Sequence, residues 1–585
     1  TAWGRLERND PSRPPTKRID IGLRGCSINY KGFPYPVYRI NGSLSVTDSE
    51  IVLNNLQGYN DSGFISCQGV WKSGPSGGSS LKLHFSCADV PLEDELRYAL
   101  QPSVQKMWAS LRPRGTIDRL EIDVDYTEAT GLSVGVMAQK RRREQNVAGR
   151  SITIKPDWFA YQLDDLVGTV YFKDGIVQLR NLHATHGVTE VRLAGRVSTD
   201  RGHWRVNLEN VHVNRLHITH ELVTALPPAL GHALTKLNLT GPISMSGLIE
   251  LEGNRESSAP QRAGWNLEFD VEDGNLDCGL QLEHLRGGLT LLGNYTDGMV
   301  TSSGQLNIDS LIFKGVQLSR IHGPLSLDSN RVVFGELAVV PSDTPPRRVY
   351  ADVFDGKLAV NAQIWYAENG RFKLDLKLQD ANLATISKEA TESRLDISGK
   401  AFADLYLHGN GNGIHSLGGH GTVDLRDADI YDFPILIDML AFLSLKRPDG
   451  VAFSSSKMEF DVEADRINFT RIDFAGDAIS LYGEGEITHI TTERRLNLVF
   501  DTSVGRDNKQ ILSWLVRPLL KEAGKRILRV YAGGVLDKPE IRRQPFPELN
   551  DTLQQVFPGQ PLARGIGVSR LPRSAGVRQP SSPRR

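Results

Sequence analysis

The chain of 585 residues has no long apolar run. Its richest apolar stretch, residues 434–445, is interrupted by Asp438. It is also shorter than the ~20 residues that a membrane-spanning helix needs. The sequence begins with Thr1 rather than Met, so we expect an upstream segment, and the residues given place no limit on a membrane anchor there.

Cysteine and net charge are also scarce. Four cysteines without CxxC spacing are too few for a disulfide framework and do not indicate a zinc site. Cys67 and Cys87 fall in adjacent expected strands, and the sequence leaves open whether they pair. A net charge of −1 excludes nucleic acid as the main partner, because phosphate neutralisation needs a surplus of Lys and Arg.

Signatures of catalysis are missing as well. His217, His220 and Glu221 do not have the HExxH spacing that places two imidazoles on zinc. The glycine-rich residues 409–413 lack the Lys-Ser/Thr pair of a phosphate-binding loop, and there is no GxSxG nucleophile elbow. We therefore expect a protein that is not an enzyme, with no catalytic residues, no metal site and no cofactor.

The dominant pattern that is present is strict alternation of apolar and polar residues. Successive side chains of a strand point to opposite faces, so alternation predicts antiparallel sheets with one apolar and one polar face. Gly-containing turns such as Asp174-Gly175, Asp273-Gly274, Asp297-Gly298 and Gly411-Asn412 indicate hairpins. The apolar stripes that we expect to share one face are Leu81, Leu83, Phe85, Leu120, Ile122, Val124, Trp265, Leu267, Phe269, Phe372, Leu374, Leu376 and Leu378.

Four segments have helical periodicity: residues 92–111, 221–237, 434–445 and 509–530. The first two align with an offset of 126 residues, which matches Leu96 to Leu222, Gly115 to Gly241 and Ile117 to Ile243. This alignment indicates an internal strand–helix–Gly–strand repeat. A third and weaker copy runs from Leu374 to the strand that ends at Leu407.

The expected fold is mainly β: an elongated, twisted antiparallel sheet of repeat modules, curled into a groove, with a few amphipathic helices. The expected modules are residues 1–130 (with helix 92–111), 131–255 (with helix 221–237) and 256–394, followed by a C-terminal domain over 395–547. Residues 548–585 contain many Arg, Pro and Ser but no acidic residue after Asp551, which predicts a basic disordered tail.

The C-terminal part contains the most specific motifs. Residues 481–487 (LYGEGEI) precede the expected helix 509–530, and residues 531–541 (YAGGVLDKPEI) follow it. This order of Gly-x-Gly strand, apolar helix and Gly-x-Leu-Asp-x-Pro strand resembles the C-terminal domain of the AsmA superfamily, which includes AsmA, TamB and YhdP. The resemblance is clearest over residues 395–547. The family's N-terminal membrane helix is not among the residues given.

The resemblance implies a bridge-like lipid-transfer protein of the bacterial envelope. Such a protein is anchored in the inner membrane by an N-terminal segment and crosses the periplasm as a curled sheet. The implied partners are phospholipid acyl chains, the inner or outer membrane and further envelope proteins. The apolar stripes described above would then face the groove.

Two alternatives remain from the residues. The first is a β-rich scaffold or assembly factor that binds outer-membrane proteins by strand pairing, without lipid transport. The second is a carbohydrate-active enzyme on a β-solenoid, which requires a cleft with paired carboxylates. Alternation alone does not separate an apolar groove from an ordinary filled core.

Overall fold

The computed structural model describes residues 2–545, with gaps at 8–15, 75–77, 143–149, 201, 227–230, 232–233, 236–237, 255–259, 278–280, 337–346, 366–369, 391–396, 412, 430–452, 454, 477–478, 505–525 and 537. Of the described residues, 74% lie in strands and 8% in helices, and the strands form one long antiparallel sheet. The expected mainly β fold is therefore confirmed. No helix among the described residues is long and apolar enough to span a bilayer.

The chain divides into two compact units. Unit 1 comprises Thr1–Val353 with Ala359–Ala367, and unit 2 comprises Phe354–Leu358 with Glu368–Arg585. Both units are larger than the modules expected from the sequence, whose boundaries remain predictions.

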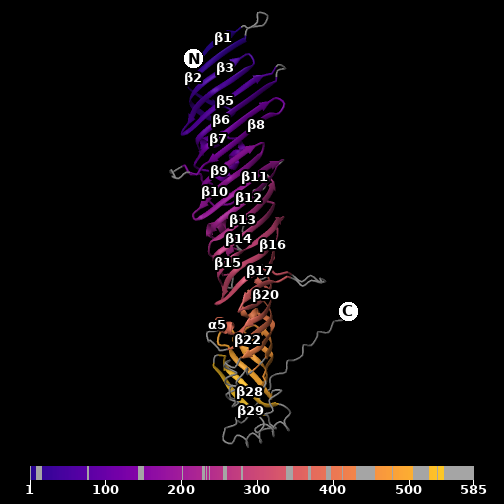
Figure 1. Cartoon of the computed structure of the whole chain (residues 1–585). Helices are drawn as coiled ribbons and strands as arrows, with labels where there is room; N and C mark the ends of the chain where they lie inside the picture. Colours follow the sequence, from indigo (N-terminus) through magenta and orange to yellow (C-terminus); the bar gives the residue numbers. More distant parts are fainter. Residues whose placement is uncertain are drawn as a thin grey trace, which may run out of the picture. The chain divides into compact units, whose positions relative to one another are not determined.

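Unit 1 is built from long strands that follow one another in chain order, indigo to magenta in Figure 1. Each pairs antiparallel with the next over most of the unit, while β17 also pairs with β19, and β18 pairs with β20. The strands are β1 (Ala2–Glu7), β2 (Thr16–Tyr30), β3 (Phe33–Thr47), β4 (Glu50–Asn60), β5 (Gly63–Ser73), β6 (Ser79–Pro91), β7 (Thr116–Thr127), β8 (Gly131–Lys140), β9 (Asp164–Lys173), β10 (Ile176–His186), β11 (Thr189–Asp200), β12 (His203–Leu216), β13 (Ile243–Asn254), β14 (Arg262–Asp277), β15 (Gln281–Thr296), β16 (Met299–Phe313), β17 (Val316–Asp328), β18 (Arg331–Phe334), β19 (Val349–Val353) and β20 (Gly356–Trp365). Its helices are α1 (Asp94–Ala99), α2 (Pro102–Leu111) and α3 (His220–Ala225).

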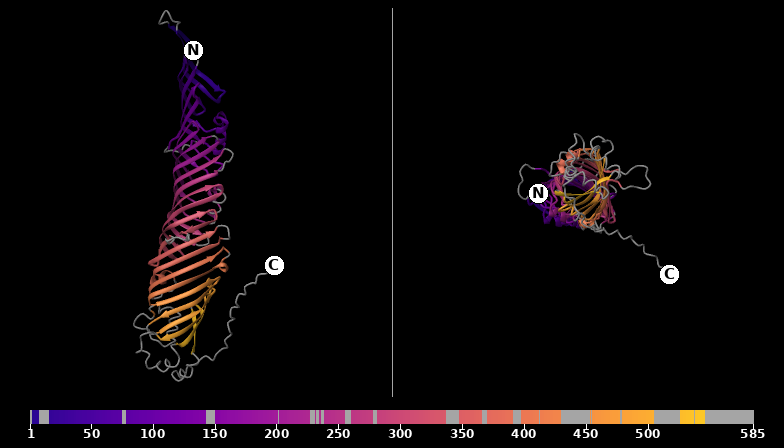
Figure 2. Two further views of the ribbon diagram at one scale, coloured as in Figure 1. Left: turned by 90° about the vertical axis from the view of Figure 1, so that its right-hand side faces the viewer. Right: turned by 90° about the horizontal axis from the view of Figure 1, so that it is seen from below.

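Unit 2 has the same meandering antiparallel order from β21 to β29. Figure 2 shows its strands, orange to yellow, curled around a common interior. Its elements are β21 (Phe372–Asn382), α5 (Leu383–Ala390), β22 (Ser398–Gly409), the 3-10 turn η2 (Ile414–Ser416), β23 (Gly418–Asp429), β24 (Ser455–Glu463), β25 (Arg466–Ala475), β26 (Ile479–Thr488), β27 (Arg495–Val504), β28 (Arg526–Val535) and β29 (Lys538–Pro545).

Two of the expected turns are tight hairpins. Asp174-Gly175 joins β9 to β10 and Asp297-Gly298 joins β15 to β16, and all four residues have positive φ, as type I′ turns require. The expected turn at Asp273-Gly274 is wrong, because both residues lie inside β14. Gly411 follows β22 in a loop, and its partner position 412 lies outside the described residues.

The expected single helix over 92–111 is instead two helices. Leu100 and Gln101 have extended backbone (ψ 160° and 152°) between α1 and α2. Pro102 explains the break, since the ring of a proline disfavours helical backbone at the residue before it. Of the expected helix 221–237, α3 covers the first turns, and the rest lies partly outside the described residues.

The internal repeat has a structural counterpart. Helices α1 and α3 each have six residues and begin 126 positions apart, at Asp94 and His220. Equivalent side chains point inward, because Leu96 and Leu222 are buried, as are Ala99 and Ala225. The weaker third copy contains α5, which follows β21 directly.

The end of the expected helix 509–530 is wrong. Residues 526–530 begin β28, which pairs with β27 on one side and β29 on the other. The remainder of that helix, the expected helix 434–445 and the tail 548–585 lie outside the described residues.

Glycines with positive φ interrupt many strands and allow the sheet to bend. Gly168 in β9 has φ +131°, and a Cβ there would lie 2.7 Å from the Asn181 carbonyl oxygen. Gly485 in β26 has φ +140°, and a Cβ would lie 2.2 Å from the Asn497 carbonyl oxygen. Only glycine fits such close approaches of two backbones, which accompany bulges and bends.

Candidate functional site: the apolar face of the sheet

The predicted apolar stripes lie in strands and share one face with their neighbours. In the β6–β7 ladder, Leu83 lies opposite Val124 and Phe85 lies opposite Ile122. Directly opposed residues of antiparallel strands point to the same side of the sheet. Leu267 of β14 likewise lies opposite Leu291 of β15.

The register of successive ladders extends these pairs into rows that cross unit 1. We call the longest the central row. From β5 to β20 it consists of Ile65, Cys87, Leu120, Ala138, Val170, Leu179, Gly195, Leu208, Ile249, Trp265, Gly293, Ser302, Leu327, Val332 and Ile364. Ser302 is its one hydroxyl-bearing residue, and no charged residue interrupts it.

A second row runs beside the central row and lies two residues away from it on each strand. It consists of Cys67, Phe85, Ile122, Val136, Phe172, Val177, Val197, Val206, Leu251, Ala263, Tyr295 and Val300. The two rows together form an apolar band across most of unit 1. Leu81, Leu83, Val124, Leu267 and Phe269 continue the band along their own strands.

The opposite face of the same strands is polar and carries cross-strand ion pairs. His84 Nδ1 of β6 lies 2.7 Å from Asp123 Oδ1 of β7. Arg205 Nε of β12 lies 2.6 Å from Glu252 Oε1 of β13. These pairs are exposed and contribute little to stability. They identify the face that water covers.

The apolar band of unit 1 is only partly covered. Within the central row, Cys87 and Ser302 are buried, whereas Trp265, Leu208 and most other members are half-buried and Ile364 is 38% exposed. All the predicted stripe residues are also half-buried. A filled sandwich core would exclude water from such side chains almost fully. Apolar surface therefore stays accessible along the band.

Helices cover this face locally. The α1 residues Leu96 and Ala99 pack with Tyr35, Cys87 and Val90 in one buried cluster, against which Phe85 and Leu120 also pack. In the equivalent place of the second repeat, the α3 residues Leu222 and Ala225 pack with Tyr161. We call the first of these clusters the α1 cap.

Unit 2 differs because part of its apolar face is filled. Leu481, Phe500 and Val530, from β26, β27 and β28, are 0–2% exposed and belong to one cluster that also includes residues of β21 and β23. The Phe474 and Phe500 rings lie 6.3 Å apart, and the Phe453 and Phe474 rings lie 5.7 Å apart. This cluster is an ordinary hydrophobic core.

The predicted stripe of β21 is divided between these two environments. Leu378 packs against the filled cluster, so it is a core residue. Phe372, Leu374 and Leu376 are half-buried outside it. The register pairs Leu376 with Leu405 and Leu374 with Leu407 on β22.

The thiols at the apolar band are free. Cys67 and Cys87 lie on adjacent strands but not opposite one another, because Cys67 faces Phe85 and Cys87 faces Ile65. Burial raises the pKa of Cys67 to about 11 and that of Cys87 to about 12, the latter helped by the nearby Cys67. Both thiols behave as small apolar groups, not as nucleophiles.

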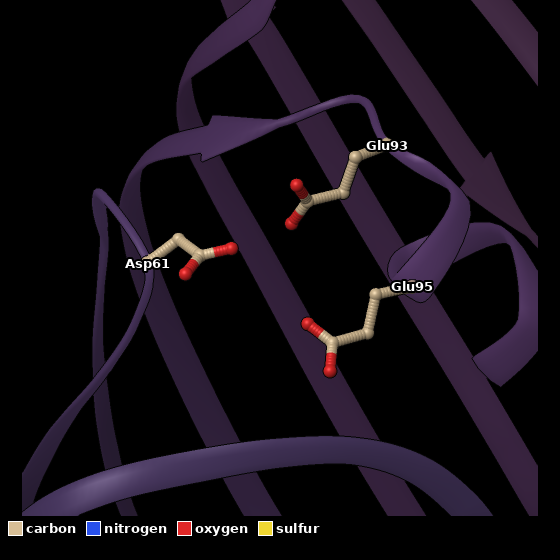
Figure 3. A group of neighbouring side chains, drawn as sticks. All are labelled: Asp61, Glu93 and Glu95. Atoms are coloured by element: carbon tan, nitrogen blue, oxygen red, sulfur yellow. The ribbon is translucent and has the colours of Figure 1, made fainter.

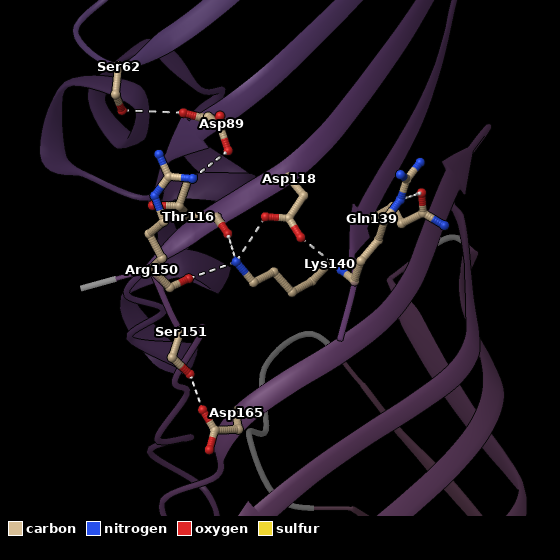
Figure 4. Close-up of polar contacts among 10 residues, drawn as sticks. Ser62, Asp89, Thr116, Asp118, Gln139, Lys140, Arg150, Ser151 and Asp165 are labelled. Atoms are coloured by element: carbon tan, nitrogen blue, oxygen red, sulfur yellow. Dashed lines mark hydrogen bonds and ion pairs between the residues drawn. The ribbon is translucent and has the colours of Figure 1, made fainter. Parts of the chain in front are cut away.

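A buried polar network anchors the end of β8 (Figure 4). Lys140 Nζ donates hydrogen bonds to the Thr116 carbonyl (2.8 Å), the Arg150 carbonyl (2.8 Å) and Asp118 Oδ1 (3.1 Å). The Lys140 and Asp118 side chains are 10% and 7% exposed. Because every Lys140 proton has an acceptor, this network joins a loop to the sheet and leaves no donor for a ligand.

Comparison with known proteins adds no relative: no family model, no curated protein and no solved structure matches the chain. The candidate site therefore depends on the geometry of the sheet alone. The alternation in the sequence predicts the individual stripes, but it does not predict the glycines and small apolar residues that join the stripes into rows. These residues can be assigned to a row only from the register of neighbouring strands, which a single sequence does not contain.

Proposed function

We propose that this protein is a non-enzymatic lipid-binding protein that holds phospholipid acyl chains on its apolar band and conducts them along it. The observation that supports this most is the central row, which crosses unit 1 without a charged residue and stays half-buried. Apolar surface of this extent on a folded protein typically marks a binding surface. A chain-shaped apolar ligand fits a band-shaped apolar surface.

The energetics favour sliding over tight binding at one place. Transfer of each acyl methylene from water to an apolar surface contributes about 0.8 kcal/mol. The band offers Val, Leu, Ile and Ala side chains at nearly every step, so neighbouring positions of the acyl chain have similar energy. No bond is made or broken, and the polar headgroup remains in water.

The biological setting is part of the same proposal. The resemblance of residues 395–547 to the AsmA superfamily supports transfer between the inner and outer membranes of a bacterial envelope. It also supports a periplasmic location with an inner-membrane anchor upstream of Thr1.

Site-specific photocrosslinking tests the proposal. A benzophenone amino acid at Phe85 on the apolar band, or at Leu376 on the half-buried stripe of β21 in unit 2, should crosslink phospholipid in living cells. Mass spectrometry of gently purified protein should detect the same lipid. Lys82 and Lys373 are matched controls, because they are exposed neighbours on the same two strands and point to the polar face. Failure to recover phospholipid, together with no crosslink at Phe85 or Leu376, would refute lipid binding.

A second candidate function is an assembly factor that pairs with strands of outer-membrane proteins. Among the described residues, β1 pairs only with β2, and β29 pairs only with β28, so each has an edge available for another strand. Co-purification of outer-membrane proteins with lipid-free protein would favour this candidate. Crosslinks from β1, but not from the apolar band, would favour it as well.

A further inference from the structure

Three carboxylates meet beside the α1 cap. Asp61 lies in the turn between β4 and β5, while Glu93 and Glu95 lie at the start of α1. Figure 3 shows the three side chains pointing toward one another. One oxygen of each carboxylate lies within 4.8 Å of an oxygen of the other two. The cluster therefore joins two segments that are distant in sequence.

No basic side chain of the described residues forms an ion pair with this cluster. Asp61 and Glu95 are exposed and Glu93 is half-buried, so water screens part of the repulsion among the three charges. A bound cation would remove the rest.

Two buried oxygens without partners belong to Glu93 and to Asn60, which hydrogen-bonds Glu95. Asn60 is 1% exposed, and its Nδ2 donates to Glu95 Oε2 (3.2 Å) and to the Pro36 carbonyl (2.8 Å). Its Oδ1 has no hydrogen-bond partner, nor does the buried Oε1 of Glu93. Native proteins rarely leave buried oxygens unsatisfied, and a missing ion is one explanation.

The Tyr35 hydroxyl is a second buried group that packs beside α1. Tyr35 is 8% exposed, and its hydroxyl has no hydrogen-bond partner. Tyr35 packs with Leu96 and Ala99 of α1, and the Asn60 amide bonds the carbonyl of the next residue, Pro36. The hydroxyl is thus a second buried and unpartnered polar group at this end of α1.

We propose that Asp61, Glu93 and Glu95 form a calcium site that fastens α1 to the β4–β5 turn. Ca²⁺ takes six to eight oxygen ligands at about 2.3–2.6 Å in flexible geometry. Oxygens on opposite sides of such an ion are about 4.8 Å apart, which suits the cluster. Asn60 Oδ1 and water complete the shell. Mg²⁺ fits less well, because it requires near-octahedral geometry and retains its waters.

The site would stabilise the α1 cap and so the cover over that part of the apolar face. This role is independent of the proposed lipid binding. The equivalent positions of the second repeat argue for a site specific to the first copy: Glu93 corresponds to Thr219, whose hydroxyl instead caps α3.

The test uses the full chain after EDTA treatment and dialysis. Calorimetric titration with CaCl2 should show one saturable site, and the melting temperature should rise with calcium. At a calcium concentration 100 times the Kd, the folded-to-unfolded ratio should rise about 100-fold. MgCl2 at the same concentration should give a smaller rise.

Two matched variants identify the site. Glu93→Gln should lose the calcium response, yet without calcium it should be at least as stable as the parent, since one repelling charge is gone. Asp94→Asn should keep the full response, because Asp94 pairs with Arg97 outside the cluster. Equal responses of the two variants, or no heat and no shift with the parent at millimolar calcium, would overturn the proposal.

Discussion

Truncation of one leucine in each unit distinguishes an open apolar face from a filled core. Leu481 is 0% exposed and lies in the filled cluster of unit 2. Leu267 lies on the apolar band of unit 1 between Gly247 and Leu291, and it is half-buried. The two Leu→Ala changes remove the same atoms from two different environments.

The two changes should lower the free energy of unfolding by different amounts, because only one of them leaves a closed cavity. In a closed core, Leu→Ala costs about 2.7–5 kcal/mol, because lost transfer free energy is added to the energy of an unfilled cavity. Leu481→Ala should fall in this range. At Leu267 no closed cavity forms, and part of the side chain already contacts solvent. Only part of the transfer term is lost, so we expect about 1–2 kcal/mol.

Hydrogen exchange at increasing urea concentrations measures the free energy of unfolding of each unit separately. Peptides from β14 report on Leu267→Ala and peptides from β26 report on Leu481→Ala, both in lipid-free protein. Leu292→Ala is the control on β15, since this side chain is 61% exposed and should cost less than about 0.5 kcal/mol. If Leu267→Ala costs as much as Leu481→Ala, unit 1 has a filled core there and the proposed lipid surface is refuted.

Three further outcomes follow from other parts of the chain. Lys140→Met should destabilise the protein by about 3 kcal/mol in urea titration, because it leaves the buried Asp118 carboxylate without its ammonium partner; adding Asp118→Asn should recover part of this loss. Gly485→Ala should lower the melting temperature by several degrees more than Gly533→Ala, since only the former has positive φ and a close backbone contact. Cys67, with a thiol pKa raised to about 11, is about one part in a thousand thiolate at pH 8, so iodoacetamide should alkylate it far more slowly in the folded protein than in urea.

The alternation of apolar residues was enough to predict the fold class and the faces of individual strands. It was not enough to predict how one strand aligns with the next. Bulges at Asn55 and Asn181 shift the register between neighbouring strands by amounts that depend on contacts distant in sequence. For this reason the rows of the apolar band became visible only in the structure.

The errors have local physical causes. Ile527 and Leu528 continue the helical periodicity of the preceding residues, but pairing with β27 and β29 places them in a strand. A short apolar run is compatible with either period, and tertiary pairing decides between them. The acidic cluster was missed for a different reason: Asp61 and Glu93 are separated by β5 and β6, and no spacing rule connects them.

The contrast between the units bears on where a ligand would be held. In unit 2, aromatic and aliphatic side chains from several strands fill the interior, so part of the apolar face is already satisfied by the protein. In unit 1 most side chains of the apolar band are half-buried, so the band keeps exposed apolar surface. Its glycines have a separate cause: a Cβ at Gly195 would lie 2.4 Å from the Asn207 carbonyl oxygen, so only glycine fits this close approach of two strands. Under the proposed lipid binding, an acyl chain would complete the burial of the half-buried side chains. A ligand spread along a row in this way needs no single indispensable residue.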